Sequence, residues 1–158
     1  MTESQLVIDA SVLAQVYVKD AEERFTTVAE EIVRRHVNGS IELVAPQFIL
    51  YEIPSAIHRA VRRRRLDPSD ARLAIRHFFN LQLRTLGGDG SLRLMIESAY
   101  MRAAQLGCHM YDALYLVVAE VLGYHFITAD NKLYRRIHDQ VDYVIWIEDY
   151  PRESDSPP

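Results

Sequence analysis

Apolar residues along the chain show two kinds of spacing: short continuous runs, and longer stretches with a period of three to four residues. The continuous runs predict strands covered on both faces, and the longer period predicts amphipathic helices. The predicted strands cover residues 6–8, 41–44, 124–128 and 143–147. The predicted helices cover residues 10–18, 21–36, 46–65, 69–83, 94–106, 110–122 and 131–137.

Strands that alternate with helices indicate an α/β fold with a mostly parallel sheet and helices on both faces. A chain of 158 residues fits one domain, which we expect to span residues 1–150. The glycine-rich stretch at 87–90 is wrongly spaced for a phosphate-binding loop and is interpreted as a plain connection. Residues 151–158 are rich in Pro, Ser and charge, which predicts a disordered tail.

Composition excludes several classes of protein. The formal net charge of -4 does not by itself indicate a nucleic-acid binder. The N-terminal residues include an acid where a signal peptide needs Lys or Arg, and no apolar run is long enough to span a membrane. We therefore expect a soluble, cytoplasmic protein. Cys108 is the single cysteine, which excludes an intrachain disulfide.

Acidic residues occupy related positions in the predicted elements. Asp9 and Asp130 each follow a buried strand, and carboxyl ends of parallel strands meet at the edge where ligands bind. Asp112 lies in the first turn of the most clearly amphipathic helix, and Glu52 lies on a helix that follows another strand. The alternative is helix capping for the three aspartates and a solvated helix face for Glu52.

A cluster of these four carboxylates would have a definite chemical preference. Clustered carboxylates repel one another and raise one another's pKa, so a cluster that stays ionised usually holds a cation. An all-oxygen set of ligands suits Mg²⁺ or Mn²⁺ rather than zinc. The pattern therefore predicts a magnesium or manganese site.

Four motifs contain these acids: Ile8-Asp9-Ala10-Ser11, Tyr51-Glu52, Tyr111-Asp112-Ala113-Leu114 and Thr128-Ala129-Asp130. Their order and spacing resemble those of PIN-domain nucleases, most closely the VapC-type toxins. The resemblance implies a PIN-like three-layer α/β/α sandwich and a metal-dependent ribonuclease that hydrolyses RNA phosphodiester bonds. It also implies that Asp9, Glu52, Asp112 and Asp130 bind one or two Mg²⁺ or Mn²⁺ ions at the active site.

The same resemblance implies partners. VapC-type toxins form homodimers and pair with a small antitoxin protein, whose tail occupies the acidic site.

Two other functions stay open. A PIN scaffold could bind RNA or a protein without cutting, and a phosphoacceptor domain of the receiver kind also gathers acids at strand ends. The chain lacks the adjacent acidic pair and the strand-ending lysine of the receiver kind.

Three polar residues are candidates for supporting the acids. Ser11 and Thr128 are placed to hydrogen-bond the liganding carboxylates or a metal-bound water, or to bond only nearby backbone groups. Asn131 follows Asp130 directly, and its alternative is to cap the helix that begins there. Some relatives have a further acid at this position.

The helix that carries Glu52 also contains Pro54 and ends in arginines. A proline inside a helix removes a hydrogen bond, which makes the direction of Glu52 the least secure of the four. Arg59 and Arg63 share one helical stripe with Glu52, and Arg59 lies about 10 Å beyond it at 1.5 Å per residue. We expect both arginines to contact RNA phosphates, against the alternative of cations that favour a helix C-terminus.

Two tyrosines, Tyr51 and Tyr111, flank two of the acids in sequence. Either ring could stack on a base, and the alternative is packing in the core.

Overall fold

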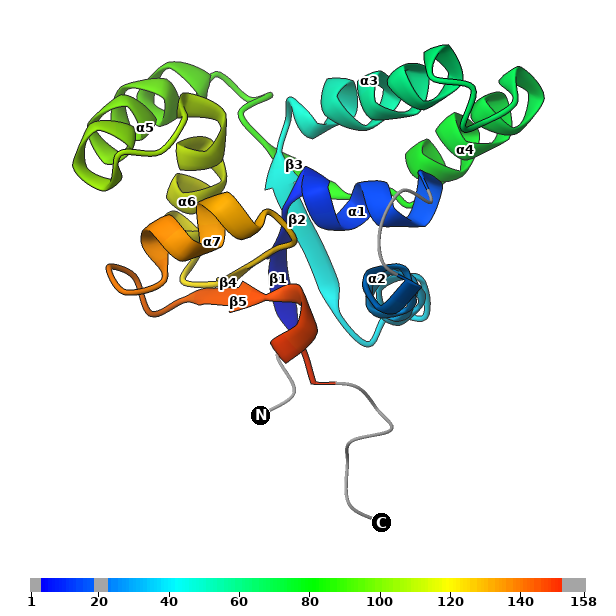
Figure 1. Ribbon diagram of the computed structural model, residues 1–158. Helices are drawn as coiled ribbons and strands as arrows, with labels where there is room; N and C mark the ends of the chain where they lie inside the picture. The colour runs from blue at the N-terminus through cyan, green and yellow to red at the C-terminus, as the bar shows by residue number, and fades with distance from the viewer. Residues whose placement is uncertain (1–3, 19–22, 152–158) are drawn as a thin grey trace.

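The computed structural model describes residues 4–18 and 23–151, which form a five-stranded parallel sheet flanked by helices (Figure 1). The strand order is β3-β2-β1-β4-β5, so the first strand is central. The strands are β1 (Gln5–Ile8), β2 (Glu42–Pro46), β3 (Arg84–Leu86), β4 (His125–Thr128) and β5 (Val144–Trp146). The helices are α1 (Ala10–Tyr17), α2 (Glu23–Val37), α3 (Ile49–Arg62), α4 (Pro68–Asn80), α5 (Leu92–Leu106), α6 (Met110–Leu122) and α7 (Asn131–Ile137), followed by a short 3-10 helix, η1 (Ile147–Asp149).

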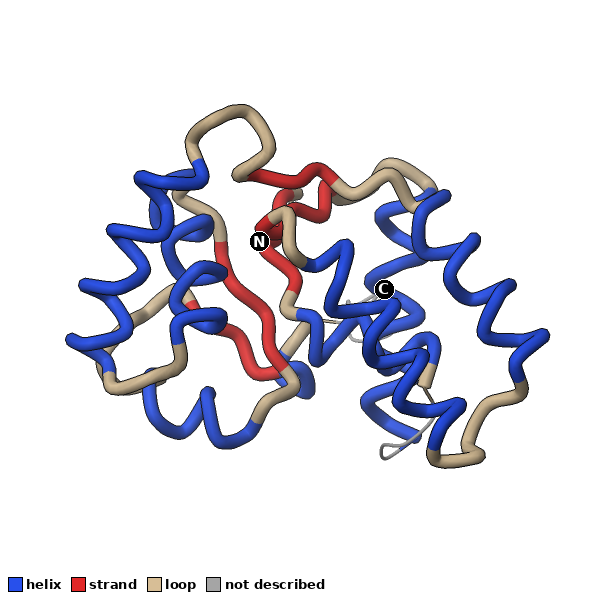
Figure 2. The backbone as a smooth tube through the Cα atoms, turned by 90° about the horizontal axis from the view of Figure 1, so that it is seen from above, coloured by secondary structure: helices blue, strands red, loops and turns tan. Residues whose placement is uncertain are grey.

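The helices form one layer on each side of the sheet (Figures 1 and 2). Helices α1 to α4 lie on one side, and α5 to α7 lie on the other. The predicted three-layer α/β/α sandwich with a mostly parallel sheet is confirmed, and all the strand pairs are parallel. Because every strand points the same way, all carboxyl ends meet at one edge of the sheet.

The core lies between the sheet and its helices. All three apolar residues of β1 at positions 6–8 have no exposed surface. Helix α6 is buried along the continuous stretch 113–119, because it contacts the sheet on one side and α5 on the other. A helix buried nearly all round holds its first turn rigidly, and that turn carries Asp112.

The structure differs from the predicted elements around β2 and β3. Pro46 was expected in the first turn of a helix, but it ends β2 and pairs with Leu86 of β3. Strand β3 was not predicted, since residues up to 83 were assigned to a helix and 87–90 to a loop. Its three residues at the sheet edge are only partly covered, so they lack the apolar run by which a buried strand is recognised.

Two glycines end the helices that flank the acidic edge. Gly107 (φ 65°) follows α5 and Gly123 (φ 68°) follows α6, both in the left-handed region that favours glycine after a helix. The predicted start of α2 at residue 21, and residues 152–158 of the tail predicted at 151–158, lie outside the described residues. Within the described ranges, no helix is both long and apolar enough to cross a bilayer.

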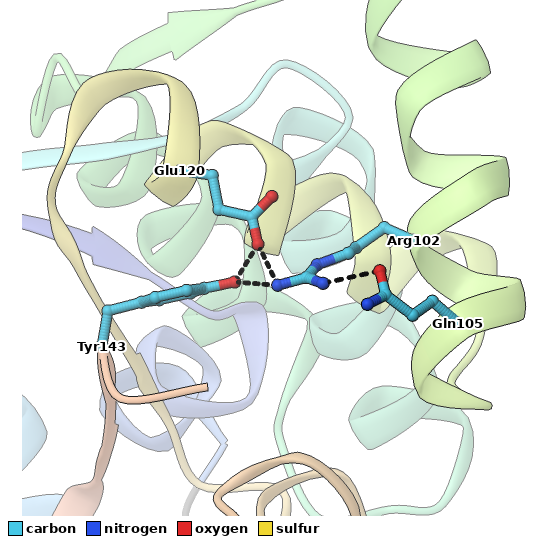
Figure 3. A network of polar contacts seen from close by, with 4 residues as sticks. All are labelled: Arg102, Gln105, Glu120 and Tyr143. Atoms are coloured by element: carbon cyan, nitrogen blue, oxygen red, sulfur yellow. Dashed lines mark hydrogen bonds and ion pairs between the residues drawn. The ribbon is translucent and has the colours of Figure 1, made fainter. Parts of the chain in front are cut away.

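A polar network joins α5, α6 and the residue before β5 (Figure 3). The guanidinium of Arg102 lies 2.5 Å from the Glu120 carboxylate and donates to Gln105 at 2.8 Å. The Tyr143 hydroxyl donates to the same Glu120 oxygen. Burial raises the pKa of Tyr143 to about 12, so its hydroxyl stays protonated as a donor at neutral pH. The network ties the outer helix to the sheet edge.

We expect Glu120→Ala to lower the free energy of unfolding by about 1–3 kcal/mol, because it leaves the mostly buried Arg102 without its carboxylate. The matched control is Glu97→Ala on α5, whose partner Arg93 is 86% exposed; an exposed ion pair contributes under about 1 kcal/mol. Urea unfolding of both variants measures the difference. Equal losses would show that the network adds nothing beyond a surface ion pair.

Candidate functional site at the carboxyl edge of the sheet

Asp9 lies directly after β1 and is 8% exposed. Its backbone is extended at the N-cap of α1, but its side chain makes no capping hydrogen bond. Instead, Oδ2 accepts hydrogen bonds from Ser11 Oγ at 2.5 Å and from Thr128 Oγ1 at 2.7 Å. The capping alternative for Asp9 is therefore wrong, and its carboxylate faces the ends of β1 and β4.

The two hydroxyls that bond Asp9 also tie together the segments after β1 and β4. Ser11 Oγ accepts from the Ala129 backbone N–H at 2.9 Å, and Thr128 Oγ1 accepts from the Asp130 N–H at 3.0 Å. Thr128 has no exposed surface. Each hydroxyl thus donates to a carboxylate and accepts from the backbone, which fixes both oxygens in place.

Asp130 is exposed and caps α7. Its Oδ1 accepts from the backbone N–H of Lys132 at 2.8 Å and of Leu133 at 3.1 Å. The capping alternative is therefore realised at Asp130 and not at Asn131, which is the first residue of the helix. Asn131 lines a different cavity, between α7, β5 and the start of α2.

Glu52 is half-buried on α3, and its Oε2 accepts a 2.6 Å hydrogen bond from the hydroxyl of Tyr115 on α6. Helix α3 continues through Pro54 to Arg62, so the proline does not end the helix or turn Glu52 away from the site. Tyr115 is 2% exposed and was not singled out in the sequence. Its signal was available, because a buried tyrosine hydroxyl usually needs a partner and Tyr115 follows Asp112 by one helical turn.

The four carboxylates lie close enough to influence one another. Burial raises the pKa of Asp112 to about 6, with further contributions from Asp9 and Asp130. Burial also raises the pKa of Glu52 to about 7, and Asp9 and Asp112 contribute to this shift. The pKa of Asp9 is raised mainly by burial, against the two hydroxyls that stabilise its charge. Asp9 and Asp112 thus interact electrostatically with each other, with Glu52 and with Asp130.

The donor set fits Mg²⁺ or Mn²⁺ in its chemistry, since all four ligating groups are carboxylates. Within residues 4–18 and 23–151, no three acidic, histidine or cysteine side chains are already gathered at ligand spacing. A divalent cation would offset the repulsion among these like charges. The four carboxylates thus lie close enough for their charges to interact, but they do not surround a single point as metal ligands would.

A cleft of about 530 Å³ opens beside the acids, between α1, α3 and the start of α6. Glu52, Arg59, Tyr51 and Tyr111 line it. The two tyrosines are 75% and 64% exposed, so the alternative of core packing is wrong for both. Arg63 lines an adjoining cavity of about 250 Å³ together with Arg59.

The fold and the acidic edge define an α/β protein with carboxylates converging at the ends of parallel strands. The chain belongs to the PIN domain family, whose family model matches residues 6–138.

Curated relatives resemble the chain in sequence, and a solved structure shares its fold. The chain is 29% identical to "Ribonuclease VapC3" of Pyrobaculum aerophilum over 82% of this chain and 92% of the relative. It is 30% identical to "Ribonuclease VapC9" of Mycobacterium tuberculosis over 81% of this chain and 87% of the relative. The crystal structure of PAE2754 from Pyrobaculum aerophilum superposes with a TM-score of 0.64 at 19% identity, covering 91% of each chain.

The raised pKa of Glu52 has a consequence for stability. Between its ordinary pKa of 4.5 and about 7, the folded chain holds a proton that the unfolded chain has released. The free energy of unfolding therefore falls as the pH rises through this range. In chelator, we expect Glu52→Gln to make the fall shallower by about 1 kcal/mol, allowing for partial exposure of the carboxylate.

Chemical denaturation from pH 4.5 to 7.5 measures this fall. The control is Glu30→Gln, which alters an exposed carboxylate on α2 and should leave the wild-type slope. A Glu52→Gln slope equal to that of the wild type would rule out a strained Glu52 carboxylate.

Proposed function

We propose that the protein is an endoribonuclease that hydrolyses RNA phosphodiester bonds with Mg²⁺ or Mn²⁺, and that it is the toxin of a toxin–antitoxin pair. One observation carries the proposal: Asp9, Glu52, Asp112 and Asp130 converge at the carboxyl edge of the sheet, beside an open cleft. Membership of the PIN domain family and similarity to VapC ribonucleases over four-fifths of the chain support it.

The residues that would hold the cation are the four carboxylates. When bound, the cation supplies an acidified water and neutralises charge on the phosphate. The Ser11 and Thr128 hydroxyls hold the Asp9 carboxylate in one orientation, and Tyr115 does the same for Glu52. Hydrogen bonds of this kind orient the carboxylates that would bind the cation. Asn131 was expected to support the acids, but its place in another cavity favours a different role.

Arg59 and Arg63 extend the site along α3. Both side chains are exposed and line the cavities that continue from Glu52. A row of cations beside a cluster of acids suits a polyanion whose scissile phosphate lies at the acids and whose neighbouring phosphates lie along the helix. The exposed rings of Tyr51 and Tyr111 line the same cleft and are available to bases.

The expected protein partners follow from the same similarity. A small antitoxin with basic groups would complement the four carboxylates and block the cleft. A homodimer is supported by the outer face of α5, which exposes the apolar side chains of Leu94, Tyr100 and Met101. The cytoplasm is the expected location for a ribonuclease paired with an antitoxin.

Purified protein should cleave single-stranded RNA with Mg²⁺ or Mn²⁺ and lose cleavage in chelator. Asp9→Asn and Asp112→Asn should each lower kcat by about a hundredfold or more, because each removes one charge from the ligand set. The matched control is Asp70→Asn, an exposed aspartate in the first turn of α4. Gel assays measure cleavage, and circular dichroism checks folding. Cleavage that persists in both folded variants would exclude the proposal, whereas Mn²⁺ binding without turnover would favour the non-cleaving scaffold.

Arg59→Gln should raise KM for RNA about fivefold and leave kcat within twofold, because it removes a phosphate contact away from the reacting bond. The salt dependence of binding should also become shallower, by roughly 0.7 in log–log slope per lost contact. Arg62→Gln is the control, since Arg62 lies in the same last turn of α3 but lines neither cavity. Equal effects of the two substitutions would mean that Arg59 adds only general positive charge.

A further inference from the structure

A second cavity of about 490 Å³ opens at the carboxyl ends of β4 and β5, on the far side of Asp130 from the cleft. Three aromatic rings line it. Phe25 of α2 packs edge-on against Trp146 with ring centroids 5.5 Å apart, and Tyr134 of α7 lies 5.5 Å from the same indole. The volume lies within the range of about 300–1,000 Å³ that is usual for small-molecule sites.

The lining of the cavity adjoins the proposed active site at the ends of β4 and β5. Trp146 is the register partner of Thr128, so the two residues sit on adjacent strands about 4.8 Å apart. Thr128 donates to Asp9 and accepts from the Asp130 backbone. Asn131, at the mouth of the cavity, is the next residue after Asp130. The cavity therefore lies beside the position expected for a scissile phosphate, where a neighbouring nucleotide would be placed.

The charges around the cavity select the kind of group that it accepts. Glu148 lies 2.5 Å from Arg24 and accepts from the Trp146 indole N–H at 3.0 Å. Because Arg24 offsets the charge of Glu148, Arg135 leaves the lining net positive, which opposes a cationic side chain. A neutral, flat ring avoids this repulsion, and it gains stacking on the aromatic side chains, which a bare phosphate does not.

We propose that this cavity, lined by Phe25, Tyr134, Trp146, Asn131 and Arg135, binds one unpaired nucleobase next to the scissile phosphodiester. The aromatic rings provide the stacking surface, as in proteins that splay out single-stranded bases. The Asn131 amide and the Arg135 guanidinium supply hydrogen bonds to the polar edge of the base. The inference rests on the proposed ribonuclease function and adds to it a place where sequence preference can arise.

Trp146 provides a direct readout, because it is the single tryptophan of the chain. The experiment titrates the full-length protein, in chelator to prevent cleavage, with a six-nucleotide single-stranded RNA labelled at one end. Anisotropy of the label reports total binding, and tryptophan emission reports the cavity alone. We expect both signals to change with the same midpoint. An abasic RNA of equal length should bind about tenfold more weakly and leave the emission unchanged.

Two variants on the exposed face of α7 test the lining without disturbing the packed rings. Asn131→Ala and Arg135→Gln should each weaken binding of the normal RNA about fivefold and leave abasic RNA binding within twofold. Arg93→Gln on α5, 86% exposed and far from the cavity, is the charge-matched control and should bind both RNAs like the wild type. Thermal melts verify that the variants are folded.

The outcomes separate this inference from the proposed function. Binding by anisotropy with no change in tryptophan emission, and equal affinity for abasic RNA, would overturn the nucleobase site and leave the ribonuclease proposal intact. Absence of both RNA binding and metal-dependent cleavage would overturn both. A basic peptide that changes the emission where RNA does not would make the cavity a protein contact, which also overturns the inference.

Discussion

The buried carboxylate of Asp9 is the constraint around which the rest of the site is arranged. It sits at the end of the central strand, where desolvation opposes its charge, and two hydroxyls from β4 and α1 offset that cost. The same hydroxyls accept backbone N–H groups after β4, so the position of Asp130 depends on the bonding of Asp9. The orientation of the Asp9 carboxylate and the position of the segment after β4 therefore depend on the same two hydroxyls.

The site places strain in a fold that is otherwise well packed. Burial of the Glu52 and Asp112 carboxylates raises their pKa values, and neighbouring like charges add to the shift. The packing of α6 against both the sheet and α5 supplies the rigidity that keeps these charges together. Such a cost is usual at functional sites, where local stability is exchanged for a prepared arrangement of groups.

The layers of the fold could be predicted from spacing alone, because buried parallel strands and amphipathic helices have distinct apolar periods. Strand β3 was missed because three partly covered residues carry no such period. Motif resemblance found the four acids, but neither spacing nor motif revealed Tyr115 or the cavity at Trp146. Both depend on contacts between elements far apart in the chain, such as the 2.6 Å bond from Tyr115 to Glu52. A one-dimensional pattern does not record these contacts.

The Asp130 side chain has two roles. Its Oδ1 caps α7, and its charge acts on the carboxylate of Asp112. A lineage that abandoned catalysis could replace Glu52 by Gln, which keeps an acceptor for Tyr115, since no helix depends on the Glu52 carboxylate for its cap. Replacing Asp130 by an apolar residue would instead cost the cap, about 1 kcal/mol. Inactive descendants of this chain should therefore lose Glu52 early and keep Asp130 long after its charge has ceased to serve a reaction.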